Sequence, residues 1–231
     1  AINYLGNLKF SVTGFLLQLF LLQSWSPEHS LSYNVPAWSV SVEMFFYFCF
    51  PFVFNHILKK FGKTFVYVLF ISFWIFCQSV MNQYYFSENY HGDKSLDRYF
   101  LFFNPAFHIS TFFMGILFGK IFIENKDRLT GNYDVLIFLI FAVSVVLIFL
   151  MDGNFFLHNG LLAIPFGLII TAVAGNTGNI TRLFNHKTMV HLGDISFAMY
   201  LLQNPVFHLL GKIYKVISIS NPFFIFFSGV L

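Results

Sequence analysis

Residues 135–150 read VLIFLIFAVSVVLIFL, an unbroken apolar run in which Ser144 carries the one polar side chain. A helix rises about 1.5 Å per residue, so about 20 residues of this kind cross the roughly 30 Å hydrocarbon core of a bilayer. A transmembrane β-strand would instead alternate apolar and polar residues in blocks of about ten. The run therefore predicts a membrane-spanning α-helix, and the same length criterion can be applied to the rest of the chain.

Seven complete spans and an eighth, incomplete one are predicted along the 231 residues. They cover approximately residues 6–23, 37–57, 64–82, 100–122, 134–151, 158–175, 193–212 and 222–231. The longest connection between them, residues 83–98, is too short to hold a soluble domain. We therefore expect an all-α fold, a polytopic transmembrane helix bundle, in a single membrane domain over residues 1–231.

The composition supports a protein whose solvent is lipid. Charged residues make up 10% of the chain and hydrophobic residues 57%, whereas an average soluble domain is about 25% charged. The 36 phenylalanines exceed what a water-facing fold could bury, but lipid-facing helices accept them. The net charge of +3 from 13 scattered Lys and Arg residues makes no basic face for a phosphate backbone, which argues against nucleic acid as a partner.

The positions of the cations predict the orientation in the membrane, because cytoplasmic loops carry the excess of Lys and Arg. Nine of the 13 flank the spans on one side: Lys9, Lys59, Lys60, Lys63, Lys120, Lys126, Arg128, Arg182 and Lys187. The opposite side has Lys94, Arg98, Lys212 and Lys215. We expect the first side to be cytoplasmic, so that Pro36 and Trp38 open the second span at the outer surface.

Cysteine and histidine spacing gives no sign of a metal site. Cys49 and Cys77 both lie inside apolar runs, which favours buried structural thiols over a disulfide or a metal ligand pair. No grouping of Cys, His, Asp and Glu has the spacing of metal ligands, and no glycine-rich phosphate loop follows a strand. We therefore expect no metal and no bound cofactor.

Glu43 is the clearest polar residue at membrane depth, where an ionisable side chain is costly and usually faces a cavity or a partner. Ser39, Glu43 and Tyr47 are spaced four apart and so form one stripe on a helix. A carboxylate there could orient a sugar hydroxyl, act as a general base or pair with a cationic catalytic group. A protonated Glu that bonds a neighbouring helix is the alternative. Ser41 lies off the stripe and suits helix packing.

A second polar stripe lies in the seventh span, where Ser196, Tyr200 and Gln203 are three and four residues apart. They share one helix face. Asp194, which follows a glycine at the start of that span, suits an N-cap. Pro205 removes a backbone donor in mid-span, and such breaks either line cavities or make simple kinks.

The fourth span contains a histidine beside other polar residues. His108 could titrate near neutrality and transfer protons, although an imidazole bonded to a neighbouring carbonyl is the favoured alternative. Gly115 and Gly119 make a G-x-x-x-G step, for which close helix packing is the favoured interpretation. The remaining histidines, His158 among them, lie in loops or at span ends.

Three blocks of sequence resemble a known family. The first is WSVSVE at residues 38–43, with Phe46, Tyr47 and Pro51 after it and LLQSW at residues 21–25 before it. It is similar to the W-S-L-S-V-E-x-x-F-Y-x-x-x-P signature of the acyltransferase-3 family of integral membrane acyltransferases, which includes bacterial O-antigen and exopolysaccharide O-acetylases.

The second and third blocks follow in family order. Residues 104–115 are similar to the family's N-P-x-x-R-x-P-E-F-x-x-G block, and residues 192–206 to its G-x-x-S-Y-x-x-Y-L-x-H-x-P-V block. The chain departs from these patterns at charged or ionisable positions: His108 stands where the family usually has Arg, Thr111 where it has Glu, and Gln203 where it has His.

The resemblance implies transfer of an acyl group, most often acetyl, from cytoplasmic acyl-CoA to a hydroxyl of a cell-surface or lipid-linked carbohydrate, in a bacterial inner membrane. It implies that Glu43, with Ser39, orients or deprotonates the acceptor, or pairs with a catalytic His. The expected substrate contacts are Trp38, Ser41, Tyr47, His108, Ser196, Tyr200 and Gln203. Because the family's catalytic His lies in a span that precedes these blocks, we expect the chain to be roughly the later two-thirds of a family domain and inactive alone.

Two other classes compete with an enzyme. A transporter of a small polar or glycan-linked solute would also place Glu, His and broken helices inside the membrane, but transporters commonly show two related halves and we find no internal repeat. A non-catalytic membrane scaffold is the third possibility. The sequence predicts neither the acceptor nor the oligomeric state.

Overall fold

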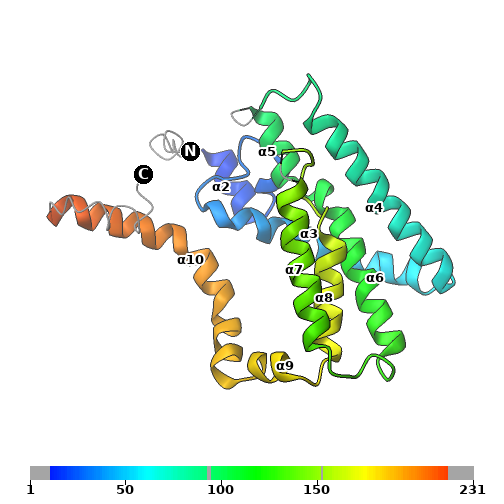
Figure 1. Cartoon of the computed structure of the whole chain (residues 1–231). Helices are drawn as coiled ribbons and strands as arrows, with labels where there is room; N and C mark the ends of the chain where they lie inside the picture. Colours follow the sequence, from blue (N-terminus) through cyan, green and yellow to red (C-terminus); the bar gives the residue numbers. More distant parts are fainter. Residues whose placement is uncertain (1–10, 93–94, 152, 218–231) are drawn as a thin grey trace.

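The computed structural model describes residues 11–92, 95–151 and 153–217, and its regular elements in these ranges are helices, with one isolated β-bridge between Gly131 and Asn176 (Figure 1). The all-α prediction is therefore confirmed. In chain order the helices are α2 (Val12–Leu19), α3 (Trp38–Val53), α4 (Lys63–Tyr85), α5 (Leu96–Phe103), α6 (Ile109–Asn125), α7 (Asp134–Met151), α8 (Ala163–Gly175), α9 (Asn179–Phe184) and α10 (Lys187–Ile217). Short 3₁₀ turns, η1 (Gln23–Trp25), η2 (Val35–Ala37) and η4 (Pro105–His108), and a π-helical turn, η3 (Phe54–Leu58), extend several of them.

The described residues contain fewer membrane-spanning helices than the seven complete spans predicted. Four are long and apolar enough to cross a bilayer: Val35–Leu58, Lys63–Tyr85, Pro105–Asn125 and Asp134–Met151. These match the second, third, fourth and fifth predicted spans. The described residues thus form a polytopic helix bundle with four candidate spans, whereas seven complete spans were predicted for the chain.

Three of the other predicted spans are not recovered among the described residues, each for a different physical reason. In residues 6–23 the described part holds only the eight residues of α2, after which the chain turns at Leu21 with a φ of 56°. In residues 158–175 the backbone is irregular up to Leu162, which leaves α8 with 13 residues. In residues 193–212, α10 is long enough, but polar residues such as Gln203 interrupt its apolar run. The predicted eighth span, residues 222–231, lies outside the described residues.

The fourth predicted span is broken rather than continuous. Pro105 cannot donate a backbone hydrogen bond, and the Asn104 side chain accepts one from the amide of Ala106 at 3.0 Å, which starts a new helix. The break separates α5 from α6 and turns the chain at the end of the bundle where α3 begins. This turn positions His108, whose ring bonds back to the Phe102 carbonyl.

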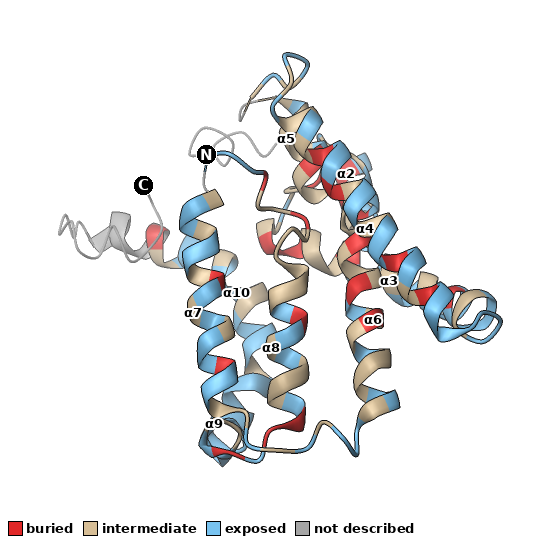
Figure 2. Cartoon of the chain, turned by 45° about the vertical axis from the view of Figure 1, so that its right-hand side comes forward, coloured by how far each residue is buried: buried red, intermediate tan, exposed pale blue. Residues whose placement is uncertain are grey.

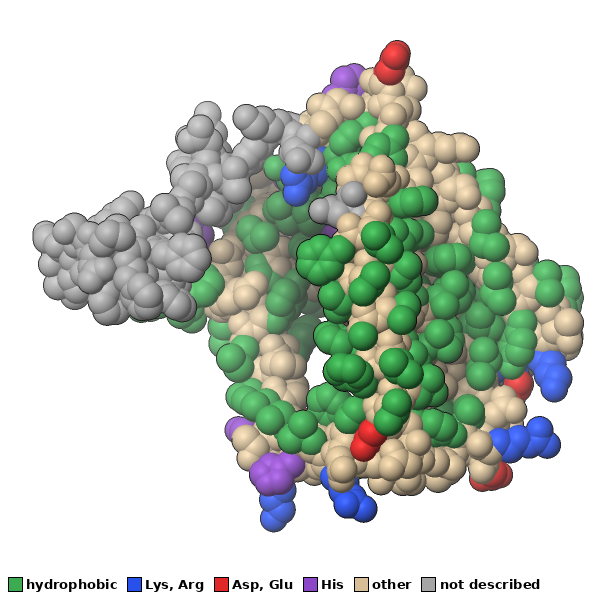
Figure 3. Space-filling view, viewed as in Figure 1, with side chains coloured by type: hydrophobic (Ala, Val, Ile, Leu, Met, Phe, Trp, Pro, Cys, Tyr) green, Lys and Arg blue, Asp and Glu red, His purple; other side chains and the backbone are tan. Residues whose placement is uncertain are grey.

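Helices α6, α7 and α8 lie side by side in both views, α4 packs on α6, and α9 and α10 turn away from them (Figures 1 and 2). The main core lies between α3, α4 and α6 and contains Val53, Val66, Phe70, Met114 and Leu117. Few residues are fully buried in Figure 2. Apolar side chains are spread over the part of the face that Figure 3 draws in colour, whereas Lys and Arg gather mainly along its lower edge, as expected for a bundle whose surface faces lipid.

Two sequence-based predictions about small and capping residues are wrong. A Cβ built on Gly115 or Gly119 meets no atom of the described residues within 4 Å, so these glycines do not mark a close helix contact there. The close approach is at Gly167 of α8, where a Cβ would lie 2.1 Å from the Phe118 ring of α6. Asp194 caps no helix, because α10 begins seven residues earlier, at Lys187.

Candidate functional site

The Glu43 stripe faces away from the rest of the described bundle. Glu43 and Tyr47 are exposed, Tyr47 by 70%. Within the described ranges the Glu43 carboxylate forms no hydrogen bond or ion pair, while the Ser39 hydroxyl donates to the Pro36 carbonyl at 3.2 Å. Ser41, off the stripe, is buried, and its hydroxyl has no partner among the described residues. The structure therefore keeps these residues on α3 without bringing Glu43 to another predicted site residue.

Of the residues predicted on the seventh span, one reaches the start of α3. The Tyr200 hydroxyl donates to the Pro36 carbonyl at 3.1 Å, and the Asn34 side chain donates to the Leu201 carbonyl at 3.1 Å. Ser196 and Gln203 remain exposed, and the Ser196 hydroxyl bonds within its own helix, to the Gly193 carbonyl at 2.7 Å. Tyr200 thus fastens α10 to the turn that precedes Trp38.

Trp38 and His108, predicted from separate sequence blocks, come together. Their ring centroids are 5.5 Å apart, and the Trp38 ring also lies 5.1 Å from that of Phe103. His108 is held there because its Nε2 bonds the Phe102 carbonyl at 2.9 Å across the break between α5 and α6. Two substrate-contact predictions therefore meet at the entry of α3.

A second imidazole, which the sequence did not single out, completes this group. The His158 ring lies 6.0 Å from that of His108 and 4.6 Å from that of Phe102. We refer to Trp38, Phe102, Phe103, His108 and His158 as the histidine cluster. It joins α3, α5, η4 and the segment between α7 and α8.

His158 belongs to an inserted loop, residues 153–162, whose backbone enters the bundle. Phe156 and Asn159 are 3% and 5% exposed. Buried irregular backbone needs hydrogen-bond partners, and α4 supplies them. The Trp74 indole donates to the Gly160 carbonyl at 2.8 Å, the Gln78 amide to the Asn159 carbonyl at 3.0 Å, and Asn82 accepts from the Phe156 amide at 2.7 Å.

The loop has a backbone conformation that one glycine makes possible. Asn159 and Gly160 have φ values of 58° and 101°. A Cβ on Gly160 would lie 2.0 Å from the Thr111 hydroxyl of α6. The Asn159 side chain also donates to the Leu101 carbonyl. These contacts fix the position of His158 between them.

Burial, together with the charge of Arg98, favours the neutral form of His158. The Arg98 guanidinium lies 5.0 Å from the Phe102 ring centroid. Burial lowers the pKa of His158, the hydrogen bond with Asn159 raises it, and the charge of Arg98 lowers it again, with a net decrease. A neutral imidazole can accept a proton, so the site offers basic nitrogens beside aromatic rings.

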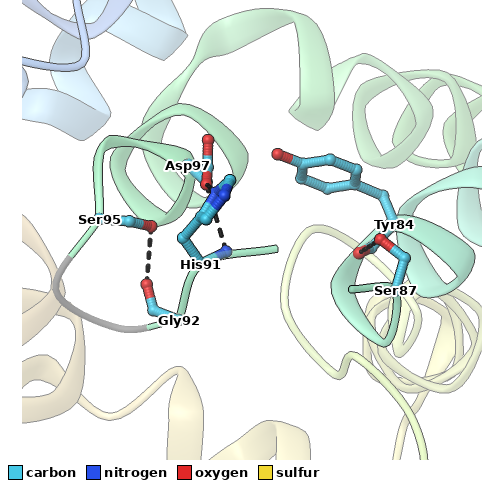
Figure 4. Close-up of polar contacts among 6 residues, drawn as sticks. All are labelled: Tyr84, Ser87, His91, Gly92, Ser95 and Asp97. Carbon is cyan, nitrogen blue, oxygen red and sulfur yellow. Dashed lines mark hydrogen bonds and ion pairs between the residues drawn. The ribbon is translucent and has the colours of Figure 1, made fainter. Parts of the chain in front are cut away.

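A His–Asp pair lies just before Arg98 in the chain. His91 Nδ1 and a carboxylate oxygen of Asp97 are 2.5 Å apart, and the Tyr84 ring points toward them (Figure 4). The hydrogen bond from His91 lowers the pKa of Asp97, and Tyr84 adds to this effect. The pair joins the chain after α4 to the first turn of α5. The His91 side chain is 73% exposed.

No metal site accompanies these groups within the described ranges, where no three His, Cys, Asp or Glu residues are arranged to hold an ion. Sequence reasoning missed His158 because it assigned this residue to the end of a span. A signal was present in the chain: the adjacent Asn159-Gly160 favours a turn with positive φ, and Gln78 and Asn82, one helical turn apart on α4, mark a face that needs polar partners.

Comparison with known proteins gives two findings. A family model described as "Acyltransferase domain", that of the acyltransferase-3 family, matches residues 2–231. The chain is also similar to the acyltransferase MdmB of Streptomyces mycarofaciens, with 25% identity over 195 residues. That alignment covers 82% of this chain and 50% of MdmB, so the chain spans about half the length of this curated relative. No solved structure matches the chain.

Proposed function

Because the chain belongs to the acyltransferase-3 family, we propose that it is part of an integral membrane O-acyltransferase whose donor is acyl-CoA, in the first place acetyl-CoA. The proposed acceptor is a hydroxyl of a cell-surface or lipid-linked carbohydrate. The proposed location is a bacterial inner membrane, with the product outside.

The observation that carries this proposal is the histidine cluster. Transfer of an acyl group to a hydroxyl needs a base for the hydroxyl proton, and the cluster holds two imidazoles. Sugar rings need a flat apolar surface beside polar groups, and binding sites generally combine aromatic walls with a few placed polar groups. Trp38 and Phe103 provide such a surface next to His108.

The charge distribution supports the proposed orientation. Trp38 lies at the beginning of the first described span, Val35–Leu58, and Lys59 and Lys60 follow its end. Under the positive-inside rule the histidine cluster is then near the outer surface. Acyl-CoA, a cytoplasmic metabolite with negatively charged phosphates, would approach from the end that carries the lysines.

For Glu43 we propose the role that the sequence suggests, in handling the acceptor hydroxyl. Its carboxylate, with Ser39 beside it, orients the acceptor or pairs with a cationic catalytic group, and its exposure on α3 leaves it available to such a partner. Ser41, Tyr47, Ser196, Tyr200 and Gln203 are proposed as further substrate contacts. In the intact protein, Glu43→Gln should abolish acyl transfer without lowering the amount of protein in the membrane, and retained activity would refute the role of Glu43.

Radiolabelled acetyl-CoA tests the proposed function. Membranes that contain the intact protein are incubated with [¹⁴C]acetyl-CoA, and the carbohydrate fraction is treated with mild alkali, which releases O-acetyl esters but not amides. Alkali-labile label that depends on the protein supports an O-acyltransferase. Uptake of a labelled solute into vesicles without transfer of label to carbohydrate would support the transporter instead.

A further inference from the structure

We propose that Gln23 and Ser24 are positioning residues of the acceptor site: they hold the backbone on both sides of Trp38 and so fix the direction of its ring. The inference rests on the acyltransferase function proposed above, and it gives a role to two residues that the sequence did not select as site residues. It is carried by two hydrogen bonds to consecutive carbonyls, by the burial of their donors and by the contacts of the Trp38 ring.

Both donors come from η1 and reach the start of α3. The Gln23 side-chain amide donates to the Ala37 carbonyl at 2.8 Å, and the Ser24 hydroxyl donates to the Trp38 carbonyl at 2.9 Å. A carbonyl oxygen has two lone pairs, so it can accept from a side chain and from a helical backbone amide together. The two bonds therefore add a second support to the first turn of α3 without interrupting the helix.

The two carbonyls belong to the two peptide planes that flank the Cα atom of Trp38. The Ala37 carbonyl lies in the plane before this atom and the Trp38 carbonyl in the plane after it, and each plane is rigid. Holding both planes fixes φ and ψ of Trp38, at −58° and −38°, and with them the direction of the Cα–Cβ bond. The ring then lies against those of Phe103 and His108, with centroids 5.1 Å and 5.5 Å away.

Water does not compete for these two bonds, because Gln23 and Ser24 are 0% and 1% exposed. A buried donor that lost its carbonyl would be left unpaired, which is costly. The turn η1 is itself anchored, since the Trp25 ring meets the Phe45 ring of α3 edge-on at 5.0 Å, and η1 also packs on α5. The donors therefore hold Trp38 from a fixed place.

The start of α3 depends on such support because its own sequence supplies little. The N-cap residue of α3 is Ala37, whose methyl group cannot accept a hydrogen bond, and Pro36 before it has no backbone N–H. From α10, the Tyr200 hydroxyl donates to the Pro36 carbonyl at 3.1 Å. Three consecutive carbonyls, at residues 36–38, are thus bonded by side chains from two other segments of the chain.

The direction of the Trp38 ring matters for the proposed reaction because a sugar that lies against it takes its orientation from it. The acceptor hydroxyl has to meet the acyl carbon at a defined distance and angle, and a misplacement of about 1 Å can cost about 10²-fold in rate. In the proposal Gln23 and Ser24 touch neither the sugar nor the acyl group. They act through Trp38, so their loss slows transfer without removing a reacting group.

Gln23→Met and Ser24→Ala test the inference by removing one hydrogen bond each. Methionine is close to glutamine in length, and the Gln23 side-chain oxygen has no partner among the described residues, so the first change removes little else. Transfer of alkali-labile label from [¹⁴C]acetyl-CoA to carbohydrate is measured in membranes with matched amounts of intact protein. We expect each variant to be roughly 10- to 100-fold slower than the wild-type protein.

Ser79→Ala is the matched control for these changes. The Ser79 hydroxyl is exposed and donates to the Ile75 carbonyl of its own helix, α4, at 2.8 Å. It makes the same kind of bond as Ser24, from a hydroxyl to a helix carbonyl, at a distance in sequence and contacts from Trp38. The control should retain the wild-type rate.

A double-mutant cycle with Trp38→Ala separates positioning from a general structural role. If Gln23 and Ser24 act through the Trp38 ring, their loss should not slow Trp38→Ala any further, because the ring that they position is gone. A general loss of folded protein would instead multiply the effects of the two changes.

Fluorescence gives a readout that does not need activity. The emission of Trp38 is the difference between each protein and its Trp38→Ala counterpart. In Gln23→Met and Ser24→Ala the ring should be held less firmly against Phe103 and His108, so acrylamide should quench this emission more readily than in the wild-type protein.

The outcomes distinguish the inference from the proposed function. Wild-type protein that transfers no label refutes the function and the inference with it. With active wild-type protein, a rate within threefold overturns the inference for the residue that was changed. An equal loss of rate with and without Trp38 also overturns it, because the residue then supports the structure only. If Trp38→Ala transfers no label, quenching decides: increased quenching of Trp38 supports the inference, and unchanged quenching overturns it.

Discussion

Gln78→Leu should destabilise the protein by releasing the inserted loop. The Gln78 amide donates to the Asn159 carbonyl at 3.0 Å and to the Ser110 hydroxyl at 3.3 Å, in the interior of the bundle. Leucine is similar in size and suits the membrane, so the change removes hydrogen bonds rather than volume. The variant therefore isolates the polar contribution of α4 to the position of His158.

The magnitude follows from the groups left unpaired. A buried polar group without a partner costs about 1–3 kcal/mol, and the variant leaves one carbonyl and one hydroxyl without their hydrogen bond from Gln78. The Gln78 side-chain oxygen has no partner among the described residues, so its removal recovers roughly the cost of one group. The net loss is about 1–3 kcal/mol, which for a chain of this length is a decrease in Tm of roughly 2–12 °C.

Thermal unfolding of the purified intact protein in detergent measures this loss. Unfolding is detected with a dye that reacts with thiols such as Cys77 when they become exposed. Gln83→Leu is the matched control, because Gln83 is an exposed residue of the same helix, and surface changes usually stay within about 0.5 kcal/mol. Equal Tm values for the two variants would refute the reasoning that α4 holds the loop.

Three further predictions concern other contacts. Gly160→Ala places a Cβ 2.0 Å from the Thr111 hydroxyl at a φ of 101°, so we expect a loss of about 2–4 kcal/mol from overpacking and strain, measured by the same unfolding assay. Asp134→Ala removes a carboxylate that accepts two backbone amides at the start of α9, at 2.7 and 3.1 Å, and should cost about 0.5–2 kcal/mol, detected as faster tryptic cleavage in α9. The hydrogen bond from His91 lowers the pKa of Asp97, so this bond contributes its full stability above the ordinary aspartate pKa of about 3.9. The contribution should be lost as the pH falls below about 3.9 and through the lowered pKa of the folded protein. The loss is measured as faster acid-protease cleavage of the loop before α5.

Each of these predictions has a control in the chain. Gly153 also has a positive φ, of 75°, but a Cβ added to it would meet no atom of the described residues within 4 Å, so Gly153→Ala should cost less than Gly160→Ala. Asp127 is exposed in the loop before α7, and Asp127→Ala should not change cleavage in α9. Asp97→Asn should remove the acid-dependent part of the cleavage, and an unchanged pH dependence in that variant would contradict the assignment to Asp97.

The sequence predicted the parts of the fold that depend on composition alone. The run at 135–150 and the spans at 37–57 and 64–82 are recovered as helices long enough to cross a membrane. Hydropathy failed where backbone geometry decides the outcome, as at Pro105, which splits one predicted span, and in the loop up to Leu162, which shortens another.

Some residues of the candidate site were predictable one by one, but not their arrangement as a group. Trp38 and His108 were selected from their own blocks, yet their contact depends on the turn at Asn104. His158 is in no motif, and the signals around it, Asn159-Gly160 in its loop and the polar face of α4, do not reveal that the two segments meet. Its position depends on hydrogen bonds from a helix more than 70 residues away in the chain. Glu43 was selected for its depth in the membrane, and that criterion does not predict a partner.

Transfer of label in membranes that contain wild-type protein or Glu43→Gln tests the central claim most directly. The account predicts alkali-labile [¹⁴C]acetyl on carbohydrate with the wild-type protein and no label above background with the variant, at equal protein in the membrane. Label that appears at equal rates with both proteins would contradict the role of Glu43, and the absence of any wild-type label would contradict the acyltransferase function itself.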